Sequence, residues 1–267
     1  MWIDTHCHLD ADEFDTDRDE VVSRARAAGV SMLVMPTGHV DDQAKVREIA
    51  HRYGYAYALG LHPLWLTDVP EGDVDRLRAA VRAAVADERF VAVGEIGIDC
   101  FEAGDVPRQE WFFREQLRVA RDAGVPVIVH VRRSADLLLK HLRRIEVPGG
   151  VIHAFNGSAQ QAGQFVARGF KLGFGGSLTY TGSERIRRHA AELPHSAWVL
   201  ETDAPYIAPS WRRTPDGVER TEPADLARIA TELASLRQVD APTLARQNRD
   251  NAIAALPRLA RLVGGPL

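Results

Sequence analysis

The stretch Trp2-Ile3-Asp4-Thr5-His6-Cys7-His8-Leu9-Asp10 holds the pattern on which the interpretation of the whole chain depends. A short apolar run leads directly into two histidines separated by one residue. Alternate side chains of a strand point to the same side, so His6 and His8 project together. Paired neutral imidazoles are typical metal ligands and fill an apolar core poorly. A His-x-His pair alone is about as often structural as metal-binding, so the other ligands must come from elsewhere in the chain.

Seven more β-rich runs follow, separated by amphipathic helical stretches. We expect strands at 2–5, 31–36, 55–61, 90–98, 126–131, 150–154, 170–175 and 198–202. We expect helices at about 16–29, 41–54, 74–87, 108–123, from Ser134 onward, 158–169, 183–192, after Pro223, and from Pro242 to Pro257. Capping-box patterns at Thr16–Asp19 and Ser158–Gln161 mark two of the helix starts.

Eight successive βα units without a linker predict a parallel (β/α)8 TIM barrel, formed by residues 1–267 as a single domain. The alternative is an open doubly wound sheet. That alternative is disfavoured because no glycine-rich dinucleotide fingerprint follows any of the strands.

Composition bounds the function classes. The 267 residues are 45% hydrophobic and 26% charged, which is ordinary for a globular protein. No apolar run approaches the roughly 20 residues of a membrane span, and the polar N-terminus does not resemble a signal peptide. Two cysteines fit a reduced, cytoplasmic protein. The net charge of −4 gives no general attraction to nucleic acid, so phosphate binding would have to be local. No obligate protein partner is evident.

Ionisable residues recur where the expected strands end. They are His6 and His8 after the first strand, His62 after the third, Glu95 late in the fourth, and His130, His153 and Asp203 at the ends of the fifth, sixth and eighth. Active sites of barrels form at these carboxyl ends. Burying so many ionisable groups without a compensating charge is costly. The pattern therefore predicts a metal site, and its nitrogen and oxygen ligands suit Zn, Mn, Co, Ni or Fe better than Mg alone.

In these motifs the chain resembles the TatD-like metal-dependent hydrolases, a family of amidohydrolase-type barrels. The resemblance covers nearly the whole chain. It rests on Ile3-Asp4-Thr5-His6-Cys7-His8-Leu9-Asp10, Gly60-Leu61-His62-Pro63, Gly94-Glu95-Ile96-Gly97-Ile98-Asp99, His130-Val131-Arg132, His153-Ala154-Phe155-Asn156-Gly157-Ser158 and Glu201-Thr202-Asp203-Ala204-Pro205-Tyr206. It implies a deoxyribonuclease with two divalent metal ions. The ligand sets that it implies are His6, His8 and Asp203 for one ion, His130 and His153 for the other, and Glu95 as the bridge.

Other residues have expected roles around this centre. Asp203 is both ligand and proton acceptor for an attacking water, and His62 contacts the phosphate or the leaving group. Glu201 shares strand parity with Asp203, and Asp4 with His6, so both are expected to support a histidine ligand. The expected substrate contacts are Arg132 foremost, with Arg212, Arg213 and Arg220 for phosphate, and Tyr206, Trp65 and Trp211 for bases. For any single one of these loop residues, surface packing is the commoner role. His39, His51, His141, His189 and His195 are expected at the surface.

Three functions remain open on the sequence. The first is a deoxyribonuclease that hydrolyses phosphodiester bonds of DNA. The second keeps the metals and changes the bond, as in a carboxylic ester or amide hydrolase such as an aminoacyl-tRNA deacylase, because fold does not decide the substrate. The third, a non-enzymatic metal-binding protein, is disfavoured because a closed structural site does not need so many ligands.

Overall fold

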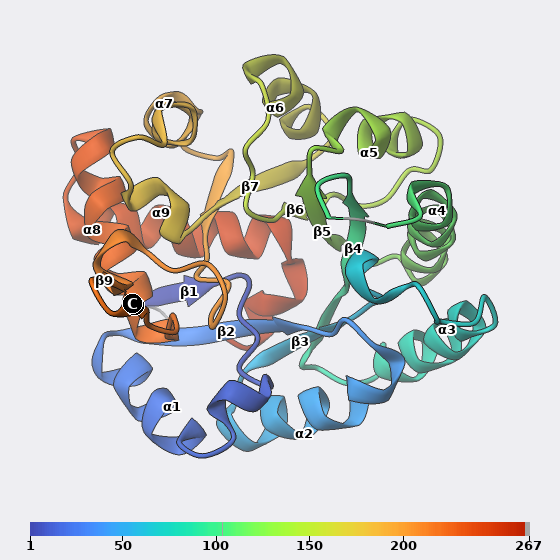
Figure 1. Ribbon diagram of the computed structural model, residues 1–267. Coiled ribbons are helices and arrows are strands. Elements are labelled where there is room, and N and C mark those ends of the chain that lie inside the picture. The colour runs from blue at the N-terminus through green and yellow to red at the C-terminus, as the bar shows by residue number, and fades with distance from the viewer. Residues whose placement is uncertain (103, 265–267) are drawn as a thin grey trace.

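Eight parallel strands form one sheet in which each strand pairs with the strands that precede and follow it in sequence (Figure 1). The computed structural model describes residues 1–102 and 104–264. The strands are β1 (Trp2–Asp4), β2 (Val30–Pro36), β3 (Ala56–Leu59), β4 (Phe90–Asp99), β5 (Val127–Arg132), β6 (Gly150–Ile152), β7 (Phe170–Phe174) and β8 (Trp198–Leu200). All eight predicted strands are confirmed.

The sheet closes between its first and last strands. The amide of Thr5 donates to the carbonyl of Leu200 at 3.0 Å, and the amide of Asp203 donates to the carbonyl of His6 at 2.9 Å. The expected (β/α)8 barrel is therefore the fold. The open-sheet alternative fails because that architecture leaves two unpaired edges.

Helices surround the barrel in the order that the alternation predicts. They are α1 (Arg18–Ala27), α2 (Gln43–Tyr53), α3 (Asp73–Ala84), α4 (Val106–Ala123), α5 (Ala135–Leu142), α6 (Ala159–Val166), α7 (Glu184–Glu192), α8 (Leu226–Arg237) and α9 (Ala241–Ala255). Short 3₁₀ helices lie at Asp12–Phe14, Val40–Asp42, Pro63–Trp65, Gly176–Thr179, Ser210–Arg212, Pro223–Asp225 and Pro257–Arg261. None of the helices within the described ranges combines the length and apolar character needed to cross a membrane.

One of the two predicted capping boxes forms. The hydroxyl of Ser158 accepts from the amide of Gln161, whose side chain accepts from the Ser158 amide, so α6 begins as expected. The box at Thr16–Asp19 is wrong, because α1 begins at Arg18 after Asp17 and has no side-chain cap. The carboxylate of Asp17 instead accepts hydrogen bonds from Arg24 and Arg220.

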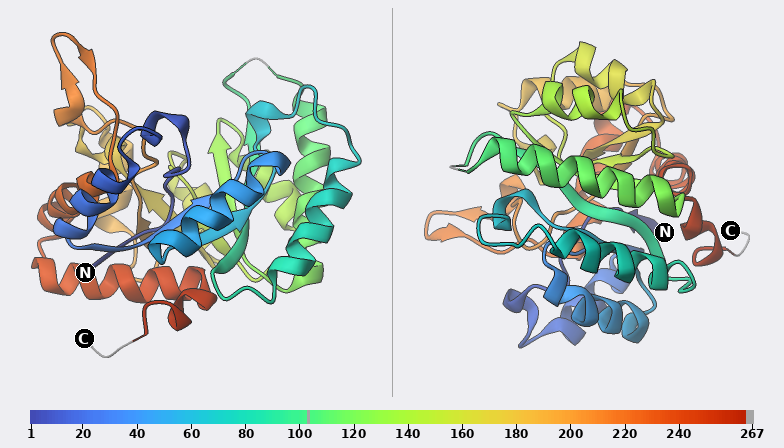
Figure 2. Two further views of the ribbon diagram at one scale, coloured as in Figure 1. Left: turned by 90° about the horizontal axis from the view of Figure 1, so that it is seen from below. Right: turned by 90° about the vertical axis from the view of Figure 1, so that its right-hand side faces the viewer.

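The two ends of the barrel differ. At the end where the strands begin, α9 lies across the opening (Figure 2). There the side chain of Asn248 accepts from the amide of Ile3 at 2.9 Å, and Asn251 donates to the carbonyl of His195 at 2.6 Å. At the opposite end the β9–β10 hairpin (Arg213–Thr214 and Gly217–Val218) projects outward. The mouth at the carboxyl ends of the strands therefore stays open to a site.

Two of the five histidines expected at the surface are buried. His189 is 7% exposed and its ring contacts the carbonyl of Gly157 at 2.9 Å, so it joins α7 to the loop before α6. His141 is 5% exposed and packs edge-on against Phe113. Both lie on the inner face of amphipathic helices, where a histidine with a polar partner substitutes for an apolar residue.

Candidate metal centre

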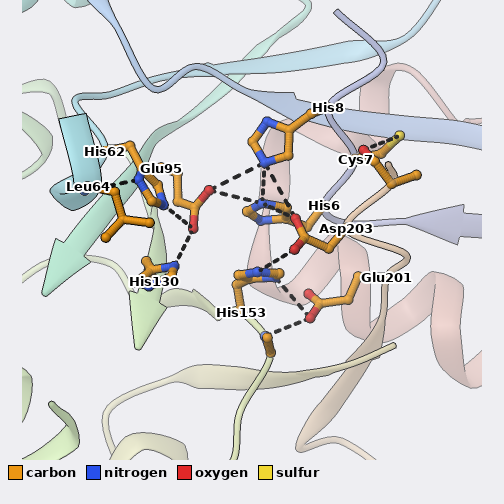
Figure 3. A network of polar contacts seen from close by, with 12 residues as sticks. His6, Cys7, His8, His62, Leu64, Glu95, His130, His153, Glu201 and Asp203 are labelled. Atoms are coloured by element: carbon orange, nitrogen blue, oxygen red, sulfur yellow. Dashed lines mark hydrogen bonds and ion pairs between the residues drawn. The ribbon is translucent and has the colours of Figure 1, made fainter. Parts of the chain in front are cut away.

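The predicted ligands converge at the mouth of the barrel, as the close-up in Figure 3 shows. Most of them line one cavity of about 1250 Å³, together with His62, Arg132 and Tyr206. His6 is fully buried beneath it. The convergence joins residues up to 197 positions apart in sequence.

On the β1–β8 side, the Nε2 atoms of His6 and His8 each lie close to an oxygen of Glu95 and to an oxygen of Asp203. The Nε2 atoms of His6 and His8 are 3.1 Å apart. One oxygen of Glu95 lies 3.1 Å from His6 Nε2 and 3.5 Å from His8 Nε2. One oxygen of Asp203 lies 3.4 Å and 3.5 Å from the same two nitrogens.

These spacings match a metal site. Tetrahedral ligands about 2.0–2.1 Å from a zinc ion lie about 3.3–3.4 Å from each other, which is close to the separations among His6, His8 and Asp203, one of the groups that could hold an ion. Two imidazoles and two carboxylates also supply the nitrogen and oxygen atoms that such an ion prefers. The residues present therefore fit a divalent cation at this position.

The second oxygen of Glu95 faces a different pair of histidines. It lies 3.0 Å from His130 Nδ1 and 3.3 Å from His62 Nε2. Glu95 thus directs one oxygen to each side of the centre, which is the geometry of a bridging carboxylate. The contact between Glu95 and His62 was not expected. Among residues 1–102 and 104–264, no group of three potential ligands contains both His130 and His153.

The tautomer of His62 follows from its local structure. His62 caps the 3₁₀ helix Pro63–Trp65, and its Nδ1 accepts from the amide of Leu64 at 3.2 Å. In the neutral ring the proton then lies on Nε2, which points to Glu95. Burial lowers the pKa of His62, so the ring stays neutral and Nε2–H is a hydrogen-bond donor at the edge of the centre.

The other two histidines each contact an outer carboxylate. Glu201 lies 3.0 Å from His153 Nδ1, as strand parity predicted, and also accepts from the amide of Ala154 at 2.7 Å. Asp203 lies 3.6 Å from the opposite nitrogen of His153. Such outer carboxylates orient a ligating imidazole and fix its tautomer.

Asp99 is the outer carboxylate that contacts His130, and the sequence analysis did not identify it. It lies 3.0 Å from His130 Nε2 and also accepts from the amides of Phe101 and Glu102. Burial would raise its pKa, but these hydrogen bonds lower it to about 2. Asp99 is four positions after Glu95 on the same strand, so strand parity was the signal that could have identified it.

Asp4 has a different role from the one expected. Its carboxylate accepts from the amides of His6 and Thr202 and from the Thr202 hydroxyl, the last at 2.6 Å. It contacts backbone and hydroxyl, and no imidazole ring. Asp4 therefore joins the first strand end to the eighth and holds the backbone of the ligands.

Charge and burial oppose each other among these groups. Burial would lower the pKa of His8, but hydrogen bonds to Asp203 and Glu95 raise it to about 10. Burial lowers the pKa of His6, which is enclosed more deeply. The histidines in turn hold the pKa of Glu95 and of Asp203 well below the usual range despite burial. Both carboxylates stay ionised, and a cation entering the group replaces protons on nitrogen.

The backbone around the site has two unusual features, a glycine packed against Glu201 and several residues with a positive φ. A Cβ at Gly173 would lie 2.2 Å from the carboxylate of Glu201, so only glycine leaves room for that side chain. Within the described ranges, four non-glycine residues have a positive φ, and three of them, Arg133, Ala154 and Asp203, line the cavity. Such residues cost about 1–3 kcal/mol each and gather at functional sites.

The rim of the cavity contains some of the expected substrate contacts. Arg132, Tyr206 and Trp65 line it. The other candidates contact groups elsewhere: Arg212 and Trp211 donate to Asp225, Arg220 bonds to Asp17 and Glu222, and Arg213 donates to the Tyr180 hydroxyl. Phe101, Arg133 and Arg185, which the sequence did not single out, line the cavity as well.

The model of the TatD-related DNase family matches residues 3–257. The chain belongs to the TatD family. Members are named as metal-dependent hydrolases, and this chain is a TatD-type metal-dependent hydrolase.

Individual relatives match nearly end to end. The chain is 39% identical over 255 residues to the uncharacterized metal-dependent hydrolase YjjV of Escherichia coli K12, covering 94% of this chain and 95% of YjjV. It is 34% identical over 259 residues to the 3'-5' ssDNA/RNA exonuclease TatD of Cronobacter sakazakii, covering 93% and 95%. The crystal structure of E. coli YjjV superposes with a TM-score of 0.88 at 36% identity, covering 96% of this chain and 98% of YjjV.

Proposed function

We propose that this TatD-family protein is a deoxyribonuclease that hydrolyses phosphodiester bonds of single-stranded DNA with two divalent cations. The observation that carries the proposal is the position of His6 and His8, whose Nε2 atoms lie 3.1 Å apart and 3.1–3.5 Å from an oxygen of Glu95 and an oxygen of Asp203, while the second oxygen of Glu95 faces another histidine pair. The exonuclease name of the Cronobacter relative supports the choice of nucleic acid.

The residues would hold two ions, with Glu95 contributing to both. His6, His8 and Asp203 would hold one, and His130 and His153 the other. When bound, such ions lower the pKa of water toward about 7 and neutralise charge on a phosphoryl oxygen. The nitrogen-rich ligand set favours Zn, Mn, Co, Ni or Fe over Mg alone.

The side chains around the ions complete the proposed chemistry. Asp203 holds an ionised carboxylate at the cavity wall and accepts the proton of the attacking water. His62 donates its Nε2 proton to a phosphate or leaving-group oxygen. Arg132, which is exposed at the cavity edge, binds a phosphate oxygen, and Tyr206, 52% exposed, stacks on a base.

We also propose a cytoplasmic location, on the basis of the two cysteines. Cys7 and Cys100 are both free thiols, which supports a reducing, cytoplasmic location.

The test is a substrate panel on protein stripped of metal and reloaded with Mn²⁺, Zn²⁺ or Mg²⁺. The substrates are end-labelled single-stranded DNA, bis(4-nitrophenyl) phosphate and an aminoacyl ester. We expect the two phosphodiesters to be cleaved with Mn²⁺ or Zn²⁺ and not after chelation. Asp203→Asn is the matched control and should lack the activity. Cleavage of the ester without cleavage of DNA would overturn the proposal and favour a carboxylic ester or amide hydrolase.

A further inference from the structure

The cavity extends well beyond the metal centre. Its lining includes residues of the β5–α5 loop, the segment before α6 and the start of α7. Its volume of about 1250 Å³ exceeds the 300–1,000 Å³ typical of a site for one small ligand. The cavity therefore has space for a substrate longer than the bond that is cleaved.

Two guanidinium groups in this extension have no acidic partner. Within the described ranges, neither Arg133 nor Arg185 has a carboxylate oxygen within 4.0 Å. Arg185 Nε donates to the side chain of Asn156 at 2.9 Å, so its terminal nitrogens remain available. Asp136, which also lines the cavity, accepts from Gln161 at 2.9 Å. The two positive charges therefore line the cavity without a carboxylate partner within the described ranges.

The ring of Phe101 restricts the side chain of Arg133. The guanidinium of Arg133 lies 4.5 Å from the ring centre of Phe101, and that of Arg132 lies 3.8 Å from the same centre. Stacking on a ring restricts a long side chain and leaves its N–H groups free at the edges. Of the seven large apolar side chains exposed within the described ranges, four line this cavity: Leu64, Trp65, Phe101 and Tyr206.

We propose that Arg133 and Arg185 form a second phosphate subsite for a neighbouring phosphate of the same nucleic-acid strand. Guanidinium groups match phosphate oxygens, and aromatic rings beside them match bases. The metal centre would receive the phosphate that is cleaved, and the extension would receive the next one. The proposed function supplies the substrate class on which this inference rests.

The first experiment measures binding without catalysis. Fluorescein-labelled oligo(dT) is titrated with chelator-treated protein at several salt concentrations, and fluorescence anisotropy gives the binding constant. Arg133→Gln and Arg185→Gln should each weaken binding and reduce the slope of log K against log salt by about 0.7, the value for one phosphate contact on a single strand. Arg246→Gln removes the same charge from α9, outside the cavity, and should leave the slope unchanged.

The second experiment compares substrates by kcat/KM. Thymidine dinucleotide with an added terminal phosphate is compared with bis(4-nitrophenyl) phosphate, which has only the phosphate that is cleaved. In each arginine variant the ratio of the two values should fall about tenfold, the effect of one charged hydrogen bond. If the ratio stays the same in the variants, or if the salt slope does not change, the proposed subsite is wrong. If the wild-type protein cleaves no phosphodiester, the proposed function fails and the salt slope alone decides the subsite.

Discussion

The floor and the rim of the cavity are built in different ways. The floor consists of His6, His8, Glu95, His130, His153 and Asp203, whose side chains are at most 15% exposed. The rim consists of Trp65, Phe101, Arg132, Arg133, Arg185 and Tyr206. Trp65, Phe101 and Arg132 expose 46% and Tyr206 52%.

This difference assigns separate tasks to the two regions. Floor residues lie at strand ends and are held by hydrogen bonds to each other and to the backbone, so their geometry is preorganised for metal binding. Of the rim residues, Phe101, Arg133 and Tyr206 lie on loops, and Trp65, Arg132 and Arg185 lie at the end of a 3₁₀ helix, the end of β5 and the start of α7. The guanidinium groups of Arg132 and Arg133 lie over the ring of Phe101. We expect changes in the floor to abolish the chemistry and changes in the rim to alter substrate affinity.

The largest effect should follow Glu95→Ala. Removing the carboxylate that faces both histidine pairs should release most of the bound metal and lower kcat/KM by at least about a thousandfold, because the ions supply several kcal/mol of charge stabilisation. Elemental analysis and a phosphodiester assay measure both effects. Glu88→Ala, an exposed carboxylate outside the cavity, is the control. A variant with full metal content would show that Glu95 does not bridge.

A smaller loss should follow Asp99→Asn and Glu201→Gln. Each change keeps the shape and removes the charge that orients His130 or His153. Outer carboxylates of this kind contribute about 10–100-fold to metal affinity or activity. Metal titration with a competing chelator measures the affinity. Unchanged affinity in both variants would mean that the two carboxylates act only on the fold.

The rim should respond differently to Arg132→Ala. We expect KM to rise about tenfold through loss of one charged hydrogen bond to phosphate. Metal content should remain that of the wild-type protein, because Arg132 contacts Glu102 and Phe101 and none of the floor residues. Steady-state kinetics and elemental analysis are both needed. A fall in metal occupancy would mean that Arg132 contributes to metal binding, as the floor residues do.

Asp87 provides a test outside the cavity, where ionisation affects stability and not activity. Burial would raise its pKa, but hydrogen bonds from Arg47, His51 and Tyr57 and from a backbone amide hold it well below the usual range. Asp87→Asn should lower the free energy of unfolding by about 1–3 kcal/mol at neutral pH.

The pH dependence of that loss has a definite sign. A carboxylate with a lowered pKa stabilises the folded state fully above its unfolded pKa of about 4, and less as the pH falls below it. The difference between wild type and Asp87→Asn in urea unfolding should therefore shrink below about pH 4. Activity should stay unchanged. A stability difference that grows in acid would contradict the assignment.

The sequence predicted the floor better than the rim for a physical reason. Strand order and parity fix which side chains meet at a barrel mouth, so His6, His8, Glu95 and Asp203 could be placed together. Asp99 follows the same rule and was overlooked. Phe101 and Arg133, which lie on loops, follow no such period. Arg133 reaches the cavity through a backbone with φ of 55°, and Arg185 reaches it from the start of α7.

Local hydrogen-bond competition explains the remaining differences. The Asp19 carboxylate, which the predicted capping box needs, accepts from Arg52 and Tyr53, while Asp17 bonds to Arg24 and Arg220, so neither carboxylate caps α1. The same partner, Arg220, is thereby kept away from the substrate role expected of it. Distant partners of this kind have no signature in a single sequence.

Anomalous X-ray diffraction from crystals soaked in Mn²⁺ or Zn²⁺ would locate the ions themselves. We expect two peaks, one on either side of Glu95, with His6, His8 and Asp203 around one of them. No peak among those residues, or a single peak outside the group, would contradict this expectation.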